Sequence, residues 1–198
     1  VRQVLDFSPQ IFEKNPGDDD YLCVRLGTGT VKAHSQVDFK AQEFKDTSDE
    51  LLDYPERLAK AYEDIEDAPV VINLRNCNAV GVLGNEAALY DMLKNITTHL
   101  AISHFYENVR FYYMFKSQDA DKYSKLRWLK NVNNEKSGMR NFMYSDDSKK
   151  HILEHLYKEF IRREAEVEKT EEAIAEFSDI IVFVMDSESV KKHPISKY

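Results

Sequence analysis

The 198-residue sequence has only two cysteines, Cys23 and Cys77, and no long hydrophobic run. Each cysteine lies beside a strand-like segment, which favours buried, reduced thiols of a cytoplasmic protein, although two cysteines also permit one disulfide. No apolar run approaches the ~18 residues that a membrane-spanning helix needs, and no signal peptide opens the chain. Because the chain begins at Val1 rather than Met, we interpret it as a piece of a longer protein.

Positive charge is also scarce, since 27 lysines and arginines stand against 35 aspartates and glutamates, a net charge of −8. No block of basic residues with interleaved aromatic residues occurs, which argues against a nucleic-acid partner. Two acidic stretches, residues 18–20 and 46–53, are typical of solvated loops, with a metal site as the alternative. Apolar residues make up 42% of the chain, enough for one large domain with a proper core.

Motifs of catalysis and metal binding are missing as well. His151 and His155 have the i, i+4 spacing of a zinc-binding helix, but Ile152 stands where the glutamate of that motif is required. We therefore interpret His155 as a surface residue. No Gly-x-Ser-x-Gly nucleophile elbow is present either. The sequence predicts no catalytic residue, no metal ligand and no cofactor.

What the sequence does contain is a strand–turn–helix pattern over residues 69–104. Residues 70–74 and 79–83 are two apolar runs typical of buried strands. Gly84 ends the second run, and Asn85 is a good N-cap for a helix. Four apolar residues then recur at steps of four, three and four, which predicts one apolar stripe on a helix. These residues are Leu89, Leu93, Ile96 and Leu100.

This pattern would place a phosphate at the helix N-terminus, but the required chemistry is absent. A P-loop needs glycines, a lysine for the phosphates and a hydroxyl for Mg²⁺, in the order GxxxxGK[ST]. Here Gly81 and Gly84 are three apart. The required Gly-Lys-Ser/Thr is replaced by Asn85, Glu86 and Ala87, and the glutamate would repel a phosphate. We interpret the segment as a tight turn of an α/β core, with a working nucleotide site as the alternative.

Strands alternate with helices through the second half of the chain, which predicts an α/β fold with a mainly parallel sheet flanked by helices. We expect residues 80–83, 109–115 and 180–185 among its central strands, and a short strand at residues 139–144. Further strands are expected at residues 21–26, before a turn or bulge at Gly27–Gly29, and at residues 36–44.

Three further helices are expected. The first covers residues 54–62, with Leu58, Ala61 and Tyr62 facing inward, and the second covers residues 119–131. The third begins after Ser145 as its N-cap. Its inward stripe has a spacing of four residues and consists of Ile152, Leu156 and Phe160.

Asp186 ends the most apolar strand-like run of the chain. In P-loop ATPases such a strand ends in Asp-Glu, where the aspartate holds Mg²⁺ through water and the glutamate activates the attacking water. Ser187 takes the position of that glutamate here, unless Glu188 reaches in from the next position. The alternative is that Asp186 caps the turn that follows it.

Several stretches together resemble one family. They are YLCVRLGTG at residues 21–29, residues 69–84 with the helix after them, LRWL at residues 126–129, and SDIIVFVMDSESVKKHPISKY at residues 178–198. They resemble the segment before the first ATPase module in the FtsK/SpoIIIE-type motor of type VII secretion systems, the EssC/EccC class. The family often continues the RWL segment with Pro-His, whereas Lys130 and Asn131 follow here.

The resemblance implies a degenerate P-loop-ATPase-like fold with an N-terminal strand extension. It implies one α/β domain over residues 1–198, with an extended lead-in (1–20), N-terminal strands and a short helix (21–68) and an ATPase-like core (69–198). The degenerate nucleotide-site positions would be Gly81, Gly84, Asn85, Glu86, Asp186 and Ser187.

The same resemblance implies a location on the cytoplasmic side of the bacterial membrane, within a longer membrane-anchored protein. The partners would be neighbouring ATPase modules, other secretion-membrane subunits and small helical-hairpin secreted substrates. A non-catalytic coupling domain is thus one hypothesis. A nucleotide-binding or hydrolysing domain with an atypical site is a second, and a free-standing α/β enzyme with a pocket at the carboxyl ends of the strands is a third.

Overall fold

The computed structural model describes residues 5, 6, 8–35, 53–134, 138–169, 177–186, 188, 190, 191 and 193–197. The chain divides into two compact units. The sheet unit comprises Val1–Tyr21 with Leu100–Tyr198, and the ribbon unit comprises Leu22–His99. Each unit is described by itself, and the domain boundaries expected from the sequence stay a prediction.

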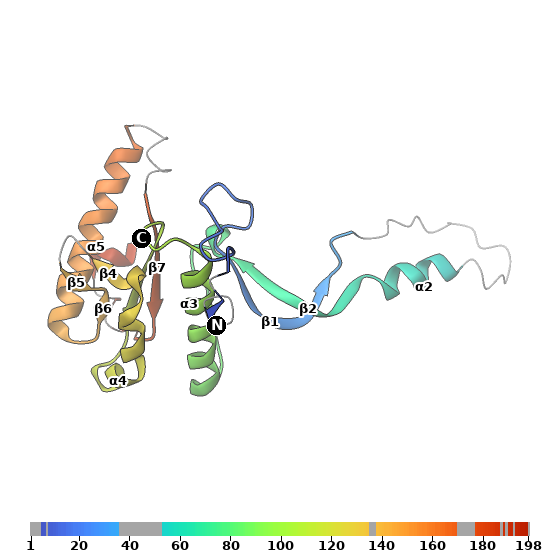
Figure 1. Ribbon diagram of the computed structural model, residues 1–198, viewed down its shortest axis with the longest axis horizontal. Coiled ribbons are helices and arrows are strands. Elements are labelled where there is room, and N and C mark those ends of the chain that lie inside the picture. The colour runs from blue at the N-terminus through green and yellow to red at the C-terminus, as the bar shows by residue number, and fades with distance from the viewer. Residues whose placement is uncertain are drawn as a thin grey trace. The chain divides into compact units, whose positions relative to one another are not determined.

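A three-stranded parallel sheet forms the centre of the sheet unit (Figure 1). β3 (Val109–Met114) lies between β6 (Phe142–Met143) and β7 (Asp179–Val184) and is parallel to both. Five of the six residues of β3 are buried, as the apolar run predicts for a central parallel strand. The prediction of an α/β fold with a parallel sheet flanked by helices is confirmed. Two of the three strands expected at its centre belong to this sheet, but only β3 is central, because β7 lies at the edge of the described sheet.

One face of this sheet carries a row of aromatic rings in register. Tyr113 pairs with Phe142 on one side and with Phe183 on the other. Its ring stacks on both, with centroid distances of 5.5 Å to Phe142 and 4.8 Å to Phe183. Because cross-strand aromatic pairs stabilise a sheet beyond the area they bury, this row holds all three strands together.

Helix α5 (Asp146–Val167) covers the opposite face of the sheet (Figure 1). Its buried stripe packs in one cluster with Tyr112, Met114 and Met143 of the sheet. The stripe consists of Ile152, Leu153 and Leu156, with Phe160 partly buried against it. The predicted stripe is confirmed, and Leu153 widens it as expected for a helix that lies on a sheet.

The connection from β3 to β6 consists of short helical turns rather than one helix. They are η3 (Ser117–Asp119), α4 (Ala120–Tyr123), η4 (Ser124–Trp128) and η5 (Lys130–Val132). Leu129 has an extended backbone, with ψ at 133°, which interrupts the helix expected over residues 119–131. Two short strands stand in place of the one expected at residues 139–144. They are β5 (Met139–Arg140), which pairs with β4 (Asn133–Asn134), and β6. The last described turn is η8 (Pro194–Lys197).

Residues near the N-terminus pack within the same unit. The Tyr21 hydroxyl donates to the Asp179 carboxylate at the start of β7, at 2.8 Å. The Tyr21 ring also meets the fully buried His104 edge-on, at 5.0 Å between centroids. These contacts fasten the segment that leads into the ribbon unit to the amino edge of the sheet.

The ribbon unit contains an antiparallel pair, β1 (Cys23–Lys32) and β2 (Asp64–Asn73). The register shifts between Arg25 and Gly27 and between Gly29 and Val31, so the glycines make bulges inside a longer strand, not a turn. A Cβ at Gly29 would lie 3.1 Å from Val70 Cγ2, which explains why a residue without a side chain suits that position. Both cysteines are free thiols and half-buried.

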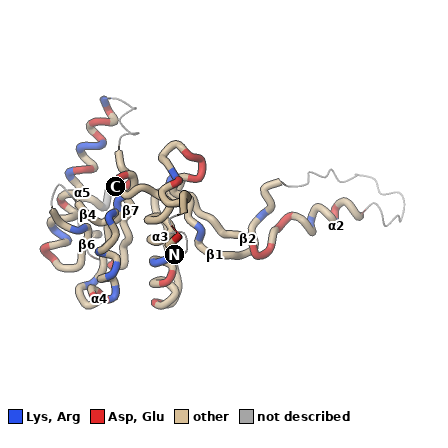
Figure 2. The backbone as a smooth tube through the Cα atoms, viewed as in Figure 1, with Lys and Arg blue, Asp and Glu red and all other residues tan. Residues whose placement is uncertain are grey.

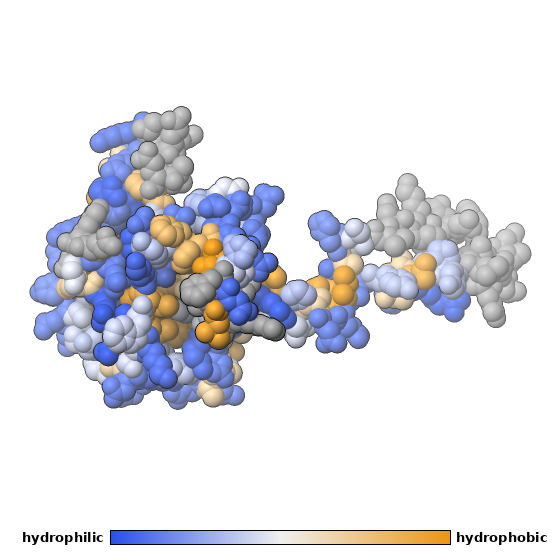
Figure 3. All heavy atoms as spheres, viewed as in Figure 1, coloured by the Kyte–Doolittle hydropathy of each residue, from blue (hydrophilic) through white to orange (hydrophobic). Residues whose placement is uncertain are grey.

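Helix α2 (Tyr54–Ala61) precedes β2, and none of its residues is buried. Leu58 and Tyr62 are exposed, so the expectation that they face inward is wrong. An amphipathic pattern indicates which side of a helix is apolar, but not that another element covers it. Figure 3 shows apolar residues at the surface of the β1–β2 ribbon and α2. The strand expected at residues 36–44 lies outside the described residues.

The expected strand at residues 79–83 is wrong. After β2 and the short turn η2 (Leu74–Asn76), residues 77–85 are neither helix nor strand. Leu83 is 99% exposed, and Val80 and Val82 are exposed as well. Within the described part of the chain no strand pairs with this run. The preceding strand, β2, pairs with β1. An apolar run alone cannot identify a strand without a partner.

Helix α3 (Glu86–Ser103) follows, as predicted. Asn85 caps it, because its Oδ1 accepts the backbone N–H of Ala88 at 2.9 Å. Leu93 and Leu100 of the predicted stripe are buried. Among the described residues, no helix has both the length and the apolar character needed to cross a lipid bilayer.

Replacing Leu156 by alanine tests the packing of α5. Leu156 is fully buried against the sheet, so Leu156→Ala should reduce the free energy of unfolding by roughly 2–5 kcal/mol. Chemical denaturation measures this change. Ile161→Ala, on the exposed side of the same helix, is the matched control and should cost less than about 1 kcal/mol. Equal losses for both variants would contradict the assigned face.

Candidate functional site

The carboxyl edge of the parallel sheet is the natural place to look for a site, because open α/β sheets bind ligands there. The strands β6, β3 and β7 end at this edge with Met143, Met114 and Val184. Helix α5 begins at the same edge, directly after β6. The first turn of α5 and the residues that follow β7 therefore come together here.

The N-terminus of α5 is closed by its own side chains. Ser145 Oγ accepts the backbone N–H of Ser148, and Ser148 Oγ accepts that of Ser145, which makes a reciprocal capping box. The first turn also carries Asp146 and Asp147, which favour the helix dipole. The side chain of Ser145 and the two carboxylates occupy the position that a phosphate would need. This helix end therefore disfavours anion binding. The predicted cap at Ser145 is confirmed.

Lys149 and Asp186 form the principal ion pair of this edge. Lys149 Nζ, in the second turn of α5, donates to Asp186 Oδ2 at 2.8 Å. The two side chains are only 14% and 10% exposed. The pair links α5 to the end of β7. The Lys149 ammonium, which could bind a phosphate, and the Asp186 carboxylate, which could bind a metal ion, neutralise each other.

The sequence pattern did not suggest Lys149. Lys149 lies 37 residues from Asp186 in the sequence. Together with Lys150 it has the pattern of two ordinary solvent-exposed lysines on a helix. One signal was available, since a helix that follows one parallel strand begins at the edge where the next strand ends. Ser187 lies outside the described residues.

The other expected positions fall in the ribbon unit. Gly81 and Gly84 have ordinary free space where a Cβ would stand, and neither has a positive φ. Asn85 caps α3, and Glu86 lies exposed in its first turn. These residues form an exposed segment and a helix start, whereas Asp186 belongs to the sheet unit.

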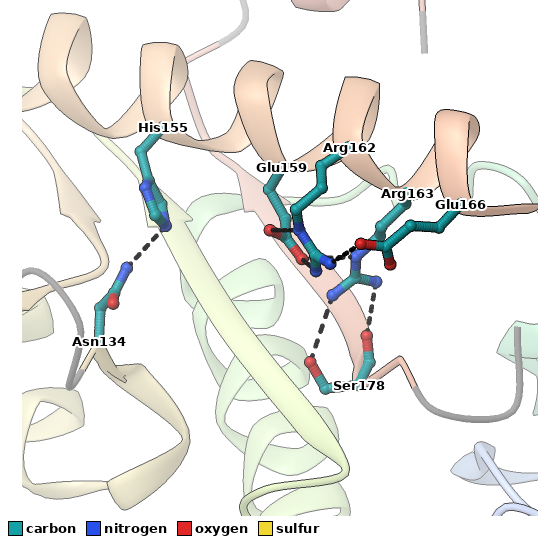
Figure 4. Close-up of polar contacts among 7 residues, drawn as sticks. All are labelled: Asn134, His155, Glu159, Arg162, Arg163, Glu166 and Ser178. Carbon is teal, nitrogen blue, oxygen red and sulfur yellow. Dashed lines mark hydrogen bonds and ion pairs between the residues drawn. The ribbon is translucent and has the colours of Figure 1, made fainter. Parts of the chain in front are cut away.

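A second polar cluster lies along α5 (Figure 4). Glu159 accepts hydrogen bonds from Arg162 at 2.7 and 3.0 Å and from Arg163 at 2.9 Å. Arg162 also reaches Glu166, and Arg163 donates to the Ser178 carbonyl at 2.7 Å. Because Ser178 immediately precedes β7, this cluster fastens the second half of α5 to the start of that strand.

The cluster also determines the ionisation of Glu159. The hydrogen bond from Arg162, followed by that from Arg163, outweighs burial and lowers the pKa of Glu159 from 4.5 to about 2. Burial, with the Glu159 charge nearby, raises the pKa of the Tyr112 phenol. The groups are held in charged pairs rather than poised for proton transfer, so the cluster has a structural role.

The two histidines at helical spacing do not converge. His151 is exposed, and His155 is half-buried, with its Nε2 3.0 Å from Asn134 Nδ2 (Figure 4). His155 is thus a partly exposed residue with one polar side-chain neighbour. Among the described residues, no three His, Cys, Asp or Glu side chains gather where they could hold a metal ion.

Removing the carboxylate of Asp186 tests the ion pair. Asp186→Ala leaves a largely buried ammonium without this partner, so we expect a loss of roughly 3 kcal/mol in the free energy of unfolding. Replacing both residues, as Lys149→Met with Asp186→Leu, should cost clearly less. The exposed pair Lys191–Glu188 provides the control, since Glu188→Ala should change stability by less than about 0.5 kcal/mol. Equal effects of Asp186→Ala and Glu188→Ala would contradict the assignment.

Acid titration tests the Glu159 cluster. A carboxylate whose pKa falls from 4.5 to about 2 on folding stabilises the protein above pH 4.5, and this stabilisation disappears as the pH falls towards 2. The urea midpoint of Glu159→Gln should therefore lie below that of the unchanged protein at neutral pH, with the difference shrinking through this range. Glu154→Gln, which breaks one exposed pair with Lys158, should show a smaller difference. A difference for Glu159→Gln that does not depend on pH would refute this account.

Among known proteins, no family model matches the chain, but several proteins are similar to it in sequence. The chain is 26% identical over 194 residues to the type VII secretion system protein EssC of Staphylococcus aureus (strain MSSA476). It is 25% identical over 195 residues to the ESX secretion system protein YukB of Bacillus subtilis (strain 168). These alignments cover 96% and 98% of the chain but only 13% of each relative. The resemblance to the EssC class is thus confirmed, and the chain is similar to one segment of much longer type VII secretion proteins.

Proposed function

We propose that this chain is a non-catalytic domain of a membrane-anchored type VII secretion motor. It would couple the membrane part of that motor to its ATPase modules during protein export. The observation that carries the proposal is the closed carboxyl edge of the sheet. Lys149 and Asp186 bind each other there, in the place where an ATPase would bind phosphate and Mg²⁺.

The proposed fold is a degenerate relative of the P-loop ATPases. A parallel sheet supports this proposal, with β6, the crossover helix α5 and β7 in the order of a βαβ unit. The first turn of α5 carries Ser145, Asp146 and Asp147 in place of a glycine-rich phosphate loop. Ser187 after Asp186 is the further degenerate position of the sheet unit in this proposal, whereas Gly84 and Glu86 precede α3 in the ribbon unit.

The similarity to long secretion proteins supports the proposed setting. A chain similar to 13% of EssC and YukB fits one module of such a protein. We place this module on the cytoplasmic side of the bacterial membrane. Its partners would be neighbouring ATPase modules of the same protein and other secretion-membrane subunits. Small helical-hairpin secreted proteins are further candidates. A domain whose site is closed would contribute through rigid contacts, which requires two arrangements with different contacts.

Nucleotide titration separates this proposal from its alternative, a nucleotide-binding domain with an atypical site. We expect ATP with Mg²⁺ to leave the thermal unfolding of the chain unchanged. A bound ligand at a hundred times its Kd would stabilise the fold by ~2.7 kcal/mol, which is readily detected. We also expect no ATP hydrolysis. Stabilisation by ATP, with turnover that disappears in the isosteric variant Asp186→Asn, would instead establish the alternative.

Charge reversal at the loop after β3 tests the coupling role. In the longer secretion protein that contains this domain, Asp119→Lys with Asp121→Lys should reduce export while protein abundance and ATPase rate stay normal. Glu107→Lys, exposed before the amino end of the same strand, is the matched control and should leave export intact. Normal export by the double variant would remove this loop from the coupling mechanism.

A further inference from the structure

The only tryptophan of the chain lies on the surface of the sheet unit. Trp128 is 73% exposed. The Arg127 guanidinium carbon lies 5.2 Å from its ring centroid, and that of Arg140 lies 5.8 Å away. Two cations over one exposed indole form a feature that the stability of the sheet does not require, since the indole buries little area.

We call this feature the Trp128 surface. Its members are Arg127 and Trp128 of η4 and Arg140 of β5, and all three are exposed. Two are cations and one is aromatic. Figure 2 shows several Lys and Arg positions along the chain around α4. The surface is basic, whereas the chain as a whole has a net charge of −8.

A buried framework holds the backbone beneath this surface. Asn131 is buried, and its Nδ2 donates to the Val109 carbonyl of β3 at 3.0 Å. Asn141, also buried, donates through its backbone N–H to the Val132 carbonyl at 2.9 Å and through its side chain to the Phe111 carbonyl. Both flanks of the Trp128 surface are therefore fixed to the central strand, which lowers the entropic cost of binding a partner.

We propose that the Trp128 surface docks an acidic segment of a partner protein. Carboxylates of that segment would pair with Arg127 and Arg140, and an apolar side chain would pack on Trp128. A guanidinium that lies over an aromatic ring keeps its N–H groups at the edge, where they can donate to a carboxylate. Tryptophan and arginine side chains are also among those that contribute most to binding at protein interfaces.

Charge favours a protein segment over a larger anionic partner. Interactions between exposed charges are screened beyond about 8 Å at physiological ionic strength. A short acidic segment on the Trp128 surface would therefore experience mainly the charges of Arg127 and Arg140. A DNA duplex or an anionic membrane is wider than this surface and would also face the acidic remainder of the chain. This inference goes beyond the proposed function and does not rest on it.

The position of the single tryptophan provides the test, because intrinsic fluorescence reports on this surface alone. The 198-residue chain is titrated with three short peptides that lack tryptophan: one of Glu and Leu, one of Glu and Ser, and one of Gln and Leu. We expect saturable binding of the Glu/Leu peptide, weaker binding of the Glu/Ser peptide and none of the Gln/Leu peptide. Added salt should weaken the binding.

The charge-neutral variant Arg127→Gln with Arg140→Gln should raise the Kd for the Glu/Leu peptide by about tenfold or more. Lys158→Gln, an exposed lysine on α5, is the control and should leave that Kd unchanged. Thermal unfolding of each variant checks the fold. Unchanged affinity in the double variant would overturn the proposal. So would tighter binding of phosphatidylserine vesicles or a DNA duplex than of the Glu/Leu peptide.

Discussion

The row of stacked rings across β6, β3 and β7 is the interaction on which the sheet unit depends. Tyr113 is fully buried at its centre, and Phe142 and Phe183 lie in register on either side. A strand of only two residues, such as β6, has little backbone pairing of its own. The ring that it contributes therefore accounts for much of its hold on the sheet.

The polar contacts of α5 follow from this arrangement. Once the three strands are parallel and adjacent, the crossover helix must begin at one edge of the sheet and end at the other. At its beginning Lys149 meets Asp186 after β7, and near its end Arg163 meets Ser178 before β7. Both ends of one helix are thus fastened to one strand, and the edge where a ligand would bind is occupied by protein groups.

The charged groups of the sheet unit differ in how they are used. At the carboxyl edge Lys149 and Asp186 bind each other, while the segment between β3 and β5 exposes Trp128 beside two arginines. That segment can carry such a surface because Asn131 and Asn141 bind the backbone of β3 below it. Rigid support and exposed contact groups suit a module that binds other proteins.

Elements with local signals could be predicted from the amino-acid sequence. Helix α3 with its Asn85 cap, the buried strand β3 and helix α5 with its Ser145 cap all follow from periodicity, apolar runs and capping residues. The resemblance to the EssC class also came from the order of short sequence segments, and the alignments to EssC and YukB confirm it. Only the tertiary structure decided that residues 79–83 stay outside the sheet, that Lys149 meets Asp186, and that Trp128 faces solvent. The physical reason is that periodicity reports the apolar side of an element, whereas burial and pairing depend on partners that are distant in the sequence.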